Sequence, residues 1–419
     1  MSIMHSIFPG DMRPAFSWRR FAVVAGPGIV VMLADTDVGS VVTAAQSGAQ
    51  WGYRLLLLQF VLIPILYVVQ ELTVRLGAVT GEGHAALIGR HFGRFWAAVS
   101  VLTLVVACVG ALLTEMGGLA GIGAMMGVPS AATMTLVVAT LTLVAVTGSY
   151  LSVERIALAA GAFELAFLLV AWWARPSLGE VAAEIVAIPV ADPKYMLLVS
   201  ANIGAVIMPW MVFYQQSAVV EKGLTPADLP AARADTAVGS VLTQLIMASV
   251  LAASAAALSR GGASPVSLDT VGQIAEALTP VLGDTAGRLV FGLGVAGAGI
   301  VAAIVVTLTA ARTLGELFGF RHSLDRPVGE APWFYAAYVL ALVAGAAVVL
   351  SGVNIVSLSV GVQVMNALLL PIVLGFLFLL ARRLPDPYRL RGPWAGVVGT
   401  VMAVTVGLGL YSGVAGIWN

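Results

Sequence analysis

Two aspartates, Asp35 and Asp37, interrupt an apolar run that extends from about residue 21 to residue 48. The run continues beyond Ser40, so both carboxylates fall near the middle of a segment long enough to cross a lipid bilayer. A carboxylate at that depth costs at least about 2.5 kcal/mol, which makes it a functional hypothesis by default. The alternative is that the run consists of two shorter segments, with the aspartates at an interface.

A later apolar run contains the pair Met208 and Pro209. Proline has no N–H, so the carbonyl of Ala205, four residues earlier, loses its helical partner. Asn202, Ala205 and Met208 share a face if the segment is helical up to Pro209. The stretch offers a carbonyl oxygen, a thioether and an amide. Taken alone, a proline kink without any ligand role explains it equally well.

Together the two segments supply a donor set for a metal ion. The donors come from Asp37, Ser40, Ala205 and Met208, with Asp35 and Asn202 as further candidates. Hard cations prefer shells made only of oxygen, whereas a thioether favours transition metals. Carboxylates at the first break argue against an anionic substrate group there. Neither cofactor motifs nor nucleophile–base arrangements are found, so we expect no enzyme and no cofactor, with the metal ion as substrate.

Three further acidic residues fall within apolar runs. Burial of Glu115 would favour its neutral form, which suits a proton carrier, although a carboxyl group bonded to a neighbouring helix is the alternative. Glu164 is better explained by a structural role. Glu71 and Arg75 are spaced i, i+4 and are expected to form a structural or gating ion pair.

The composition requires that membrane helices position these residues. Hydrophobic residues make up 60% of the 419 and charged residues only 10%, with a mean hydropathy of +0.99. Soluble domains carry about 25% charged residues, because their surface faces water. The formal net charge is zero, which gives no case for nucleic acid as a partner. The single cysteine, Cys108, excludes an intramolecular disulfide and is expected to be a small core residue.

We predict an all-α polytopic membrane protein with about eleven transmembrane helices. The predicted spans are about 21–48, 53–77, 96–125, 130–149, 153–174, 195–222, 235–259, 286–317, 332–351, 356–381 and 395–417. An N-terminus on the cytoplasmic side of the cell membrane places sixteen of the 21 basic residues inside and five outside. The odd number of spans then puts the C-terminus outside. The loop at about 259–285 is expected to hold a short amphipathic segment.

The two interrupted runs occupy corresponding positions, first and sixth, in two successive sets of five helices. This pattern is typical of a LeuT-like inverted repeat with broken helices 1 and 6 around a midplane site. We therefore divide the chain into a cytoplasmic tail at 1–20, a first five-helix repeat at 21–174, a second at 195–381 and an additional helix 11 at 395–417.

Several motifs in these segments resemble those of the Nramp family of proton-coupled divalent metal transporters. They are Gly26-Pro-Gly28, Asp37-Val-Gly-Ser40, Gly52-Tyr53, Arg75-Leu-Gly-Ala-Val-Thr-Gly81 and Met208-Pro209. The resemblance covers about residues 22–380. It implies import of manganese or iron through the lipid bilayer, with Asp37, Ala205 and Met208 as ligands and proton entry driving uptake. Glu115 falls where the family has an aspartate on its proton route, and Lys222 falls near a basic residue ending helix six.

The chain also departs from the family pattern at several positions. Ser40 replaces an asparagine, Val38 a proline, Trp210 a histidine, Gly118 a second acid and Leu358 a glutamine on helix ten. The additional Asp35 is closer to Nramp-related branches, some of which carry magnesium, so a magnesium carrier is the alternative substrate assignment. A channel or a metal-gated receptor is a third possibility, but rings of like charge and repeated subunit motifs are not evident.

Overall fold

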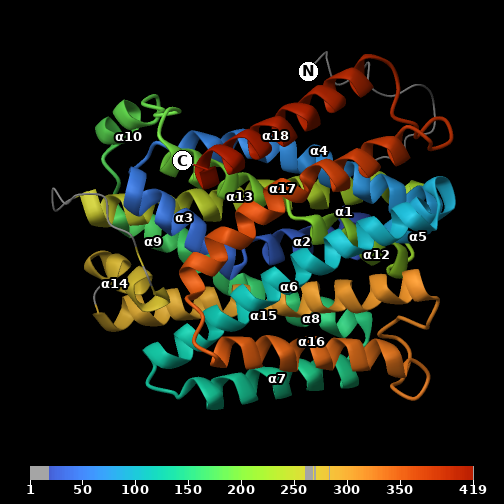
Figure 1. Cartoon of the computed structure of the whole chain (residues 1–419), viewed down its shortest axis with the longest axis horizontal. Helices are drawn as coiled ribbons and strands as arrows, with labels where there is room; N and C mark the ends of the chain where they lie inside the picture. The colour runs from blue at the N-terminus through green and yellow to red at the C-terminus, as the bar shows by residue number, and fades with distance from the viewer. Residues whose placement is uncertain (1–17, 260–267, 269, 283, 419) are drawn as a thin grey trace.

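Helices account for all the regular structure of the residues that the computed structural model describes, which are 18–259, 268, 270–282 and 284–418. Most of the long helices run side by side along the long axis of the molecule (Figure 1). Residues 1–17 of the predicted tail lie outside the described part of the chain. The apolar runs therefore form helices, as their length and composition predict.

The first half of the chain contains α1 (Trp18–Val24), α2 (Pro27–Asp35), α3 (Val38–Trp51), α4 (Leu56–Thr80), α5 (His84–Phe92), α6 (Arg94–Met125), α7 (Ser130–Thr147), α8 (Tyr150–Gly161), η2 (Ala162–Leu165), α9 (Ala166–Ala174) and α10 (Leu178–Glu184). The second half contains α11 (Pro193–Val206), α12 (Pro209–Glu221), η3 (Pro226–Asp228), α13 (Leu229–Ser259), α14 (Val271–Leu282), α15 (Asp284–Phe318), α16 (Pro332–Leu350), α17 (Ile355–Ala381) and α18 (Gly392–Trp418).

Within the described residues, ten helices are long and apolar enough to cross a membrane, and the bent pair α2 and α3 forms an eleventh span. These spans correspond one to one to the eleven predicted runs, and most ends agree to within a few residues. The seventh span begins at Pro226 instead of residue 235, and the first begins at Pro27 instead of residue 21. The segment predicted in the loop at 259–285 is α14. The chain is a polytopic membrane protein.

The first span is broken between α2 and α3, where the two aspartates occur. The axis bends by 49° between the end of α2 at Asp35 and the start of α3 at Val38. Asp37 is the N-cap residue of α3, and its side chain accepts a hydrogen bond from the Ser40 N–H at 2.6 Å. The first N–H groups of a helix lack helical acceptors and carry partial positive charge, so this position stabilises a carboxylate.

The sixth span is broken between α11 and α12. α11 ends at Val206, and Pro209 is the first residue of α12. Between them, Met208 has an extended backbone, with φ −91° and ψ 140°. The missing N–H of Pro209 ends the hydrogen-bond ladder here, as predicted.

A third interruption lies in the fifth span and was not predicted. The 3₁₀ turn η2 (Ala162–Leu165) separates α8 from α9 and carries the fully buried Glu164. The local sequence contains no proline, and a short 3₁₀ segment inside a helix often marks a functional position.

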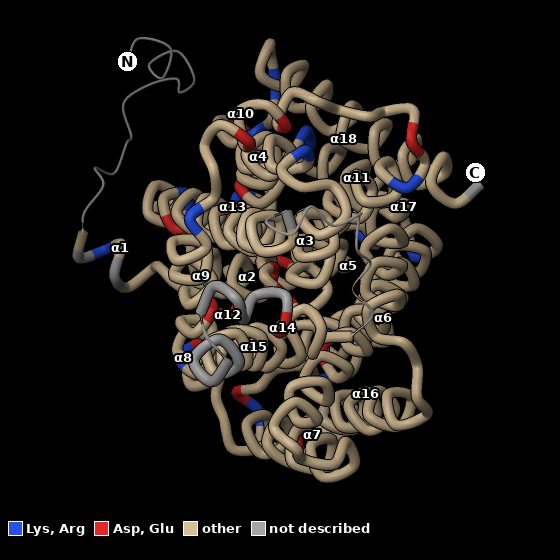
Figure 2. The backbone as a smooth tube through the Cα atoms, turned by 90° about the vertical axis from the view of Figure 1, so that its left-hand side faces the viewer, with Lys and Arg blue, Asp and Glu red and all other residues tan. Residues whose placement is uncertain are grey.

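The broken spans lie in the middle of the bundle. Seen end-on, α2 and α3 are central, whereas α7 and α16 lie at the edge (Figure 2). In its most apolar stretch, 94% of residues in the α11–α12 span are buried, against 17% in α7 and 33% in α16. The outer helices thus present their side chains to lipid, and the breaks are enclosed by protein.

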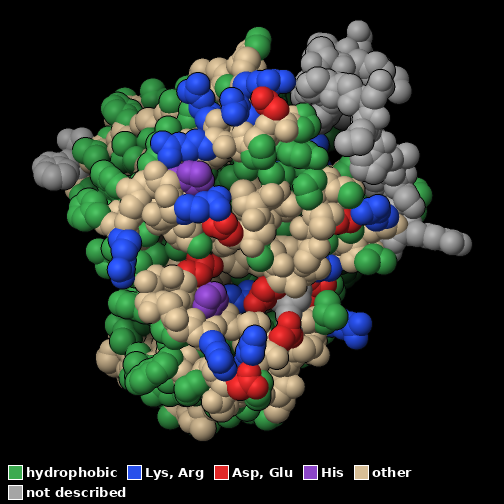
Figure 3. Space-filling view, turned by 90° about the vertical axis from the view of Figure 1, so that its right-hand side faces the viewer, with side chains coloured by type: hydrophobic (Ala, Val, Ile, Leu, Met, Phe, Trp, Pro, Cys, Tyr) green, Lys and Arg blue, Asp and Glu red, His purple; other side chains and the backbone are tan. Residues whose placement is uncertain are grey.

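One end of the bundle carries most of the ion pairs. Charged side chains and histidines gather on this face (Figure 3). Glu71 is 2.5 Å from Arg75, which confirms the predicted pair, and 2.8 Å from Arg233. Further pairs are Arg20–Asp228, Arg90–Glu82, Lys222–Glu154, Arg312–Glu221, Arg326–Glu330 and Arg391–Asp386.

The N-terminal end of α2 is fastened to its neighbours. Asp235 of α13 accepts hydrogen bonds from the Gly26 N–H at 3.3 Å and from the Gly28 N–H at 2.7 Å. Lys222 donates to the Ala25 carbonyl at 2.8 Å. The start of the half-helix α2 is thereby held by side chains of α12 and α13.

Candidate metal site

The two breaks are joined by a hydrogen bond from the Ser40 hydroxyl to the Ala205 carbonyl at 3.0 Å. Pro209 leaves this carbonyl without a helical donor, so Ser40 supplies the missing one. All four principal predicted ligands, Asp37, Ser40, Ala205 and Met208, are 0% exposed. The structure therefore brings the two predicted donor segments together, although they are 165 residues apart.

Asp37 presents a free oxygen in this arrangement. Its Oδ1 accepts from the Ser40 N–H at 2.6 Å and lies 3.5 Å from the Gln363 side-chain nitrogen, whereas Oδ2 has no hydrogen-bond partner. A buried carboxylate oxygen without a partner is costly, unless an additional group binds it. The geometry is suited to a cation placed against Oδ2.

Gln363 of α17 is the site residue that the sequence analysis missed. Leu358, at the position where the resemblance places a helix-ten glutamine, lies in the first turn of α17, and Gln363 five residues further on reaches Asp37. Gly39 and Gly204 both pack closely against Gln363, where a Cβ atom would collide with it. In the sequence, the only signal was a polar residue inside an apolar run. The structure shows that Gln363 is fully buried and accepts a hydrogen bond from Asn366 at 2.9 Å.

Asn202 is not among the ligands that the geometry supports. Its Nδ2 donates to Ser47 at 2.8 Å and to the Leu198 carbonyl at 2.7 Å, and its Oδ1 accepts from Gln59 at 2.6 Å. The prediction assumed that the helix continues to Pro209, but α11 ends at Val206. Asn202 consequently joins α3, α4 and α11 instead of facing the break with Met208.

Asp35 has different neighbours from Asp37. Its Oδ2 lies 3.5 Å from the Thr243 hydroxyl of α13, and its Oδ1 has no hydrogen-bond partner. The two carboxylates are close enough to interact electrostatically. The two side chains point to different sides of the break: Asp37 lies near α17, and Asp35 lies near α13.

Glu115 of α6 holds the start of α3. Its Oε2 accepts from the Val38 N–H at 3.1 Å, and its Oε1 accepts from the Thr114 hydroxyl at 3.1 Å. Through the backbone of Val38 it is one residue from Asp37. The predicted proton carrier therefore lies beside the candidate metal site.

The sequence model of the family described as natural resistance-associated macrophage protein-like (Nramp) matches residues 28–415. The chain belongs to the Nramp family. The divalent metal cation transporter MntH of Verminephrobacter eiseniae is 27% identical over 91% of this chain and 86% of the relative. MntH of Burkholderia ambifaria is 26% identical over 96% of this chain and 92% of the relative.

Solved structures confirm the fold. A manganese transporter from Eremococcus coleocola has a TM-score of 0.76 at 18% identity, covering 98% of this chain and 89% of that one. A Na⁺-coupled sialic acid symporter has a TM-score of 0.60 at 12% identity, covering 94% and 90%. The predicted LeuT-like fold and the Nramp resemblance are confirmed, and the boundaries of the two repeats stay predictions.

The departures from the Nramp pattern have local explanations at two positions. A Cβ on Gly118 would collide with the Val38 side chain, so Val38 fills the space of a second acid on α6. Trp210 is fully buried, and its indole N–H has no hydrogen-bond partner. A tryptophan fills the place of the family's histidine without offering a metal-binding nitrogen.

Lys222 is not beside Glu115. It is buried in a 2.8 Å ion pair with Glu154 of α8 and bonds the chain just before α2. The predicted proton-pathway role of Lys222 has no geometric support. The ammonium group of Lys222 lies at the start of α2, whereas Glu115 lies beyond the other end of that helix.

One histidine is more buried than a loop position suggests. His84 starts α5, is 0% exposed, and lies 2.8 Å from the Gln216 side-chain oxygen through its Nδ1. Desolvation by burial is the main cause that lowers the pKa of His84 to about 4, with the Gln216 bond acting in the opposite direction. This imidazole is neutral at physiological pH and links the start of α5 to Gln216 of α12.

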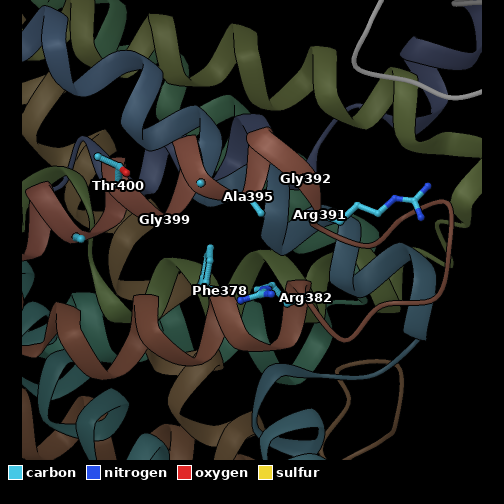
Figure 4. A pocket seen from close by; sticks show the side chains of 9 residues that line it. Phe378, Arg382, Arg391, Gly392, Ala395, Gly399 and Thr400 are labelled. Atoms are coloured by element: carbon cyan, nitrogen blue, oxygen red, sulfur yellow. The ribbon is translucent and has the colours of Figure 1, made fainter.

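Metal clusters built from three or more His, Cys, Asp or Glu residues do not occur in the described part of the chain. The candidate site at the two breaks combines the carboxylate of Asp37 with neutral donors. A surface cavity of about 510 Å³ lies elsewhere, between α17 and α18, and is bordered by Phe378, Arg382 and Arg391 (Figure 4). The candidate metal site is enclosed within the bundle.

Proposed function

We propose that this Nramp protein is a secondary transporter that imports a divalent transition metal ion, manganese or iron. The observation that carries the proposal is the Ser40–Ala205 hydrogen bond, which joins the two breaks around the free Oδ2 of Asp37. Relatives named as divalent metal cation transporters, and the likeness in fold to a manganese transporter, support it.

The ligands in this proposal are Asp37, Ala205 and Met208, with Ser40 as a further oxygen donor and the Gln363 amide beside Asp37. The charge of Asp37 offsets part of the charge of the ion, and the C-terminal ends of α2 and α11 add their negative dipole ends. The thioether of Met208 favours manganese, iron or cadmium over magnesium. The enclosure of the site within the bundle supports a carrier in this proposal, in preference to a pore.

We further propose that Glu115 binds the coupling proton. It is fully buried and is linked to Asp37 through the backbone of Val38. A metal ion at Asp37 repels a proton on Glu115, which gives a route for coupling between metal entry and proton movement. The end that carries the ion pairs is assigned to the cytoplasm, with the N-terminus inside and the C-terminus outside, by the excess of basic residues there.

Asp35 favours a second candidate, a magnesium carrier. Its carboxylate adds a hard oxygen donor beside the break, where magnesium prefers an all-oxygen shell. Competition uptake in proteoliposomes with manganese, iron, magnesium and calcium separates the two substrates. The magnesium assignment requires that excess magnesium suppress manganese uptake.

The test of the site is Asp37→Asn. We expect a folded protein that binds and transports almost no manganese, because the variant removes the one charged ligand. Manganese uptake near the rate of the unmodified protein would rule the assignment out. Uptake that rises linearly with concentration, without saturation, would instead identify a pore.

A further inference from the structure

A second group of oxygen atoms lies on the other side of the first break, where the proposed transition-metal site does not reach. It comprises Asp35 at the end of α2, Thr36 in the break, Glu164 in η2 and Thr243 of α13. All four side chains are 0–1% exposed. Three spans that are distant in sequence therefore contribute to one buried oxygen-rich position.

These side chains are connected through the two threonines. The Thr36 and Thr243 hydroxyls are 2.8 Å apart, and the Thr243 hydroxyl is 3.5 Å from Asp35 Oδ2. The Glu164 side chain interacts with the Thr36 side chain, and it is close enough to Asp35 for the two carboxylates to interact electrostatically. The hydroxyls thus lie between two carboxylates that come from different elements.

Three carboxylate oxygens at this position have no hydrogen-bond partner of normal geometry, namely Asp35 Oδ1 and both oxygens of Glu164. The charges that act on Glu164 are those of other carboxylates, Asp37 first, then Asp35 and Glu115. Lys222, a basic residue on the adjoining part of the bundle, is already paired with Glu154. Buried, unpaired carboxylates that repel each other call for a positive ligand.

The geometry points to a second cation site, formed by Asp35, Thr36, Glu164 and Thr243, that binds a hard divalent cation such as Ca²⁺ or Mg²⁺. Every donor is an oxygen, and two carboxylates balance the two positive charges of the ion. The C-terminal end of α2, with Thr36 as its C-cap, adds a negative dipole end. This site goes beyond the proposed function, because it contains none of the ligands assigned there to manganese.

The 3₁₀ turn in the fifth span now has a physical explanation. An uninterrupted α-helix would change the direction of Glu164 relative to the break by altering the rotation per residue. Gly161, just before η2, packs against Leu33 so closely that a Cβ atom would collide with it. The fifth span is thus brought against α2 at the level where Glu164 meets Thr36.

Equilibrium binding to the purified full-length protein tests the site. ⁴⁵Ca²⁺ is titrated while cadmium saturates the sulfur-containing site, and we expect one calcium ion bound per chain, displaced by excess magnesium. Loss of a peripheral partner of a metal site typically weakens binding about 10–100-fold. Loss of a direct carboxylate ligand in Glu164→Gln should therefore weaken calcium binding at least about 100-fold.

Glu164→Asp keeps the charge on a shorter side chain and should retain measurable calcium binding, which separates loss of a ligand from misfolding. Glu276→Gln is the matched control, since Glu276 is an exposed residue of α14. Cadmium titration of each variant reports on the first site. The inference is overturned if calcium does not bind beside cadmium, or if Glu164→Gln binds calcium as tightly as Glu276→Gln.

The same binding experiments distinguish failure of the second cation site from failure of the proposed transition-metal site. Calcium binding that depends on Glu164, in a protein that binds neither cadmium nor manganese at Asp37, would leave this site standing and reject the proposed function. Cadmium binding that depends on Asp37 and Met208, without calcium binding that depends on Glu164, would do the reverse.

Discussion

Gly39→Ala tests whether Gln363 contributes to metal binding. A Cβ atom at position 39 would lie 2.5 Å from the Gln363 side-chain nitrogen and 3.4 Å from Asp37 Oδ1. The atom it meets is the far end of a flexible side chain, so Gln363 can rotate away while the backbone stays in place. The substitution therefore separates Gln363 from Asp37 without removing any polar group.

The expected effect is on binding, with little change in stability. Displacing Gln363 removes one hydrogen-bonding donor or ligand, worth about 0.5–1.5 kcal/mol. At about 1.4 kcal/mol per factor of ten, the manganese Kd should rise about 2–10-fold. Calorimetric titration measures the Kd, and thermal unfolding in the same detergent should show the Tm within about 2 °C of the unmodified protein.

Gly375→Ala is the control for this experiment. Gly375 lies on the same helix, α17, is exposed, and has open space where a Cβ atom would be added. We expect neither the Kd nor the Tm to move by more than the small gain of an alanine in a helix. An unchanged manganese Kd in Gly39→Ala would refute the role of Gln363 in binding.

Three further predictions address selectivity, coupling and pH. Met208→Ala should narrow the preference for cadmium and manganese over magnesium by about 10-fold, or about 1–2 kcal/mol, in competition binding, because it removes the only soft donor proposed. Glu115→Gln should retain metal binding but abolish metal-driven proton flux, measured with a pH dye inside proteoliposomes. His84 has its pKa lowered from 6.5 to about 4 in the folded protein, so stability should be constant above pH 6.5 and fall by up to about 3 kcal/mol toward pH 4. His84→Asn should flatten the Tm in that window.

The positions of the two metal-site breaks could be predicted because covalent chemistry fixes them. Pro209 has no N–H wherever it occurs, and a carboxylate such as Asp37 in an apolar run requires a helix end or an ion. The missing N–H of Pro209 and the carboxylate of Asp37 each affect the helix only within a few residues along the chain, so the sequence alone reveals them. The eleven spans were predictable for the same reason, since length and hydropathy are local properties.

Contacts between helices could not be predicted in this way. Gln363 reaches Asp37 because Gly204 and Gly39 allow α17 to approach, which depends on the register of three helices. Asn202 was a further candidate ligand on the condition that the helix continues to Pro209, whereas α11 ends at Val206 and Met208 has an extended backbone. Local propensity does not give the direction of a side chain where a tertiary contact decides it.

The departures at Val38 and Gly118 are best understood as one change. The family pattern has proline at the position of Val38, and proline could not donate the N–H that Glu115 accepts at 3.1 Å. The Val38 side chain in turn fills the space beside Gly118, which leaves no room there for a second acid. The single carboxylate on this face of α6 is therefore tied to the backbone of the break itself. A change in the protonation of Glu115 would strengthen or weaken the hydrogen bond that fixes the start of α3, and through it the orientation of Asp37.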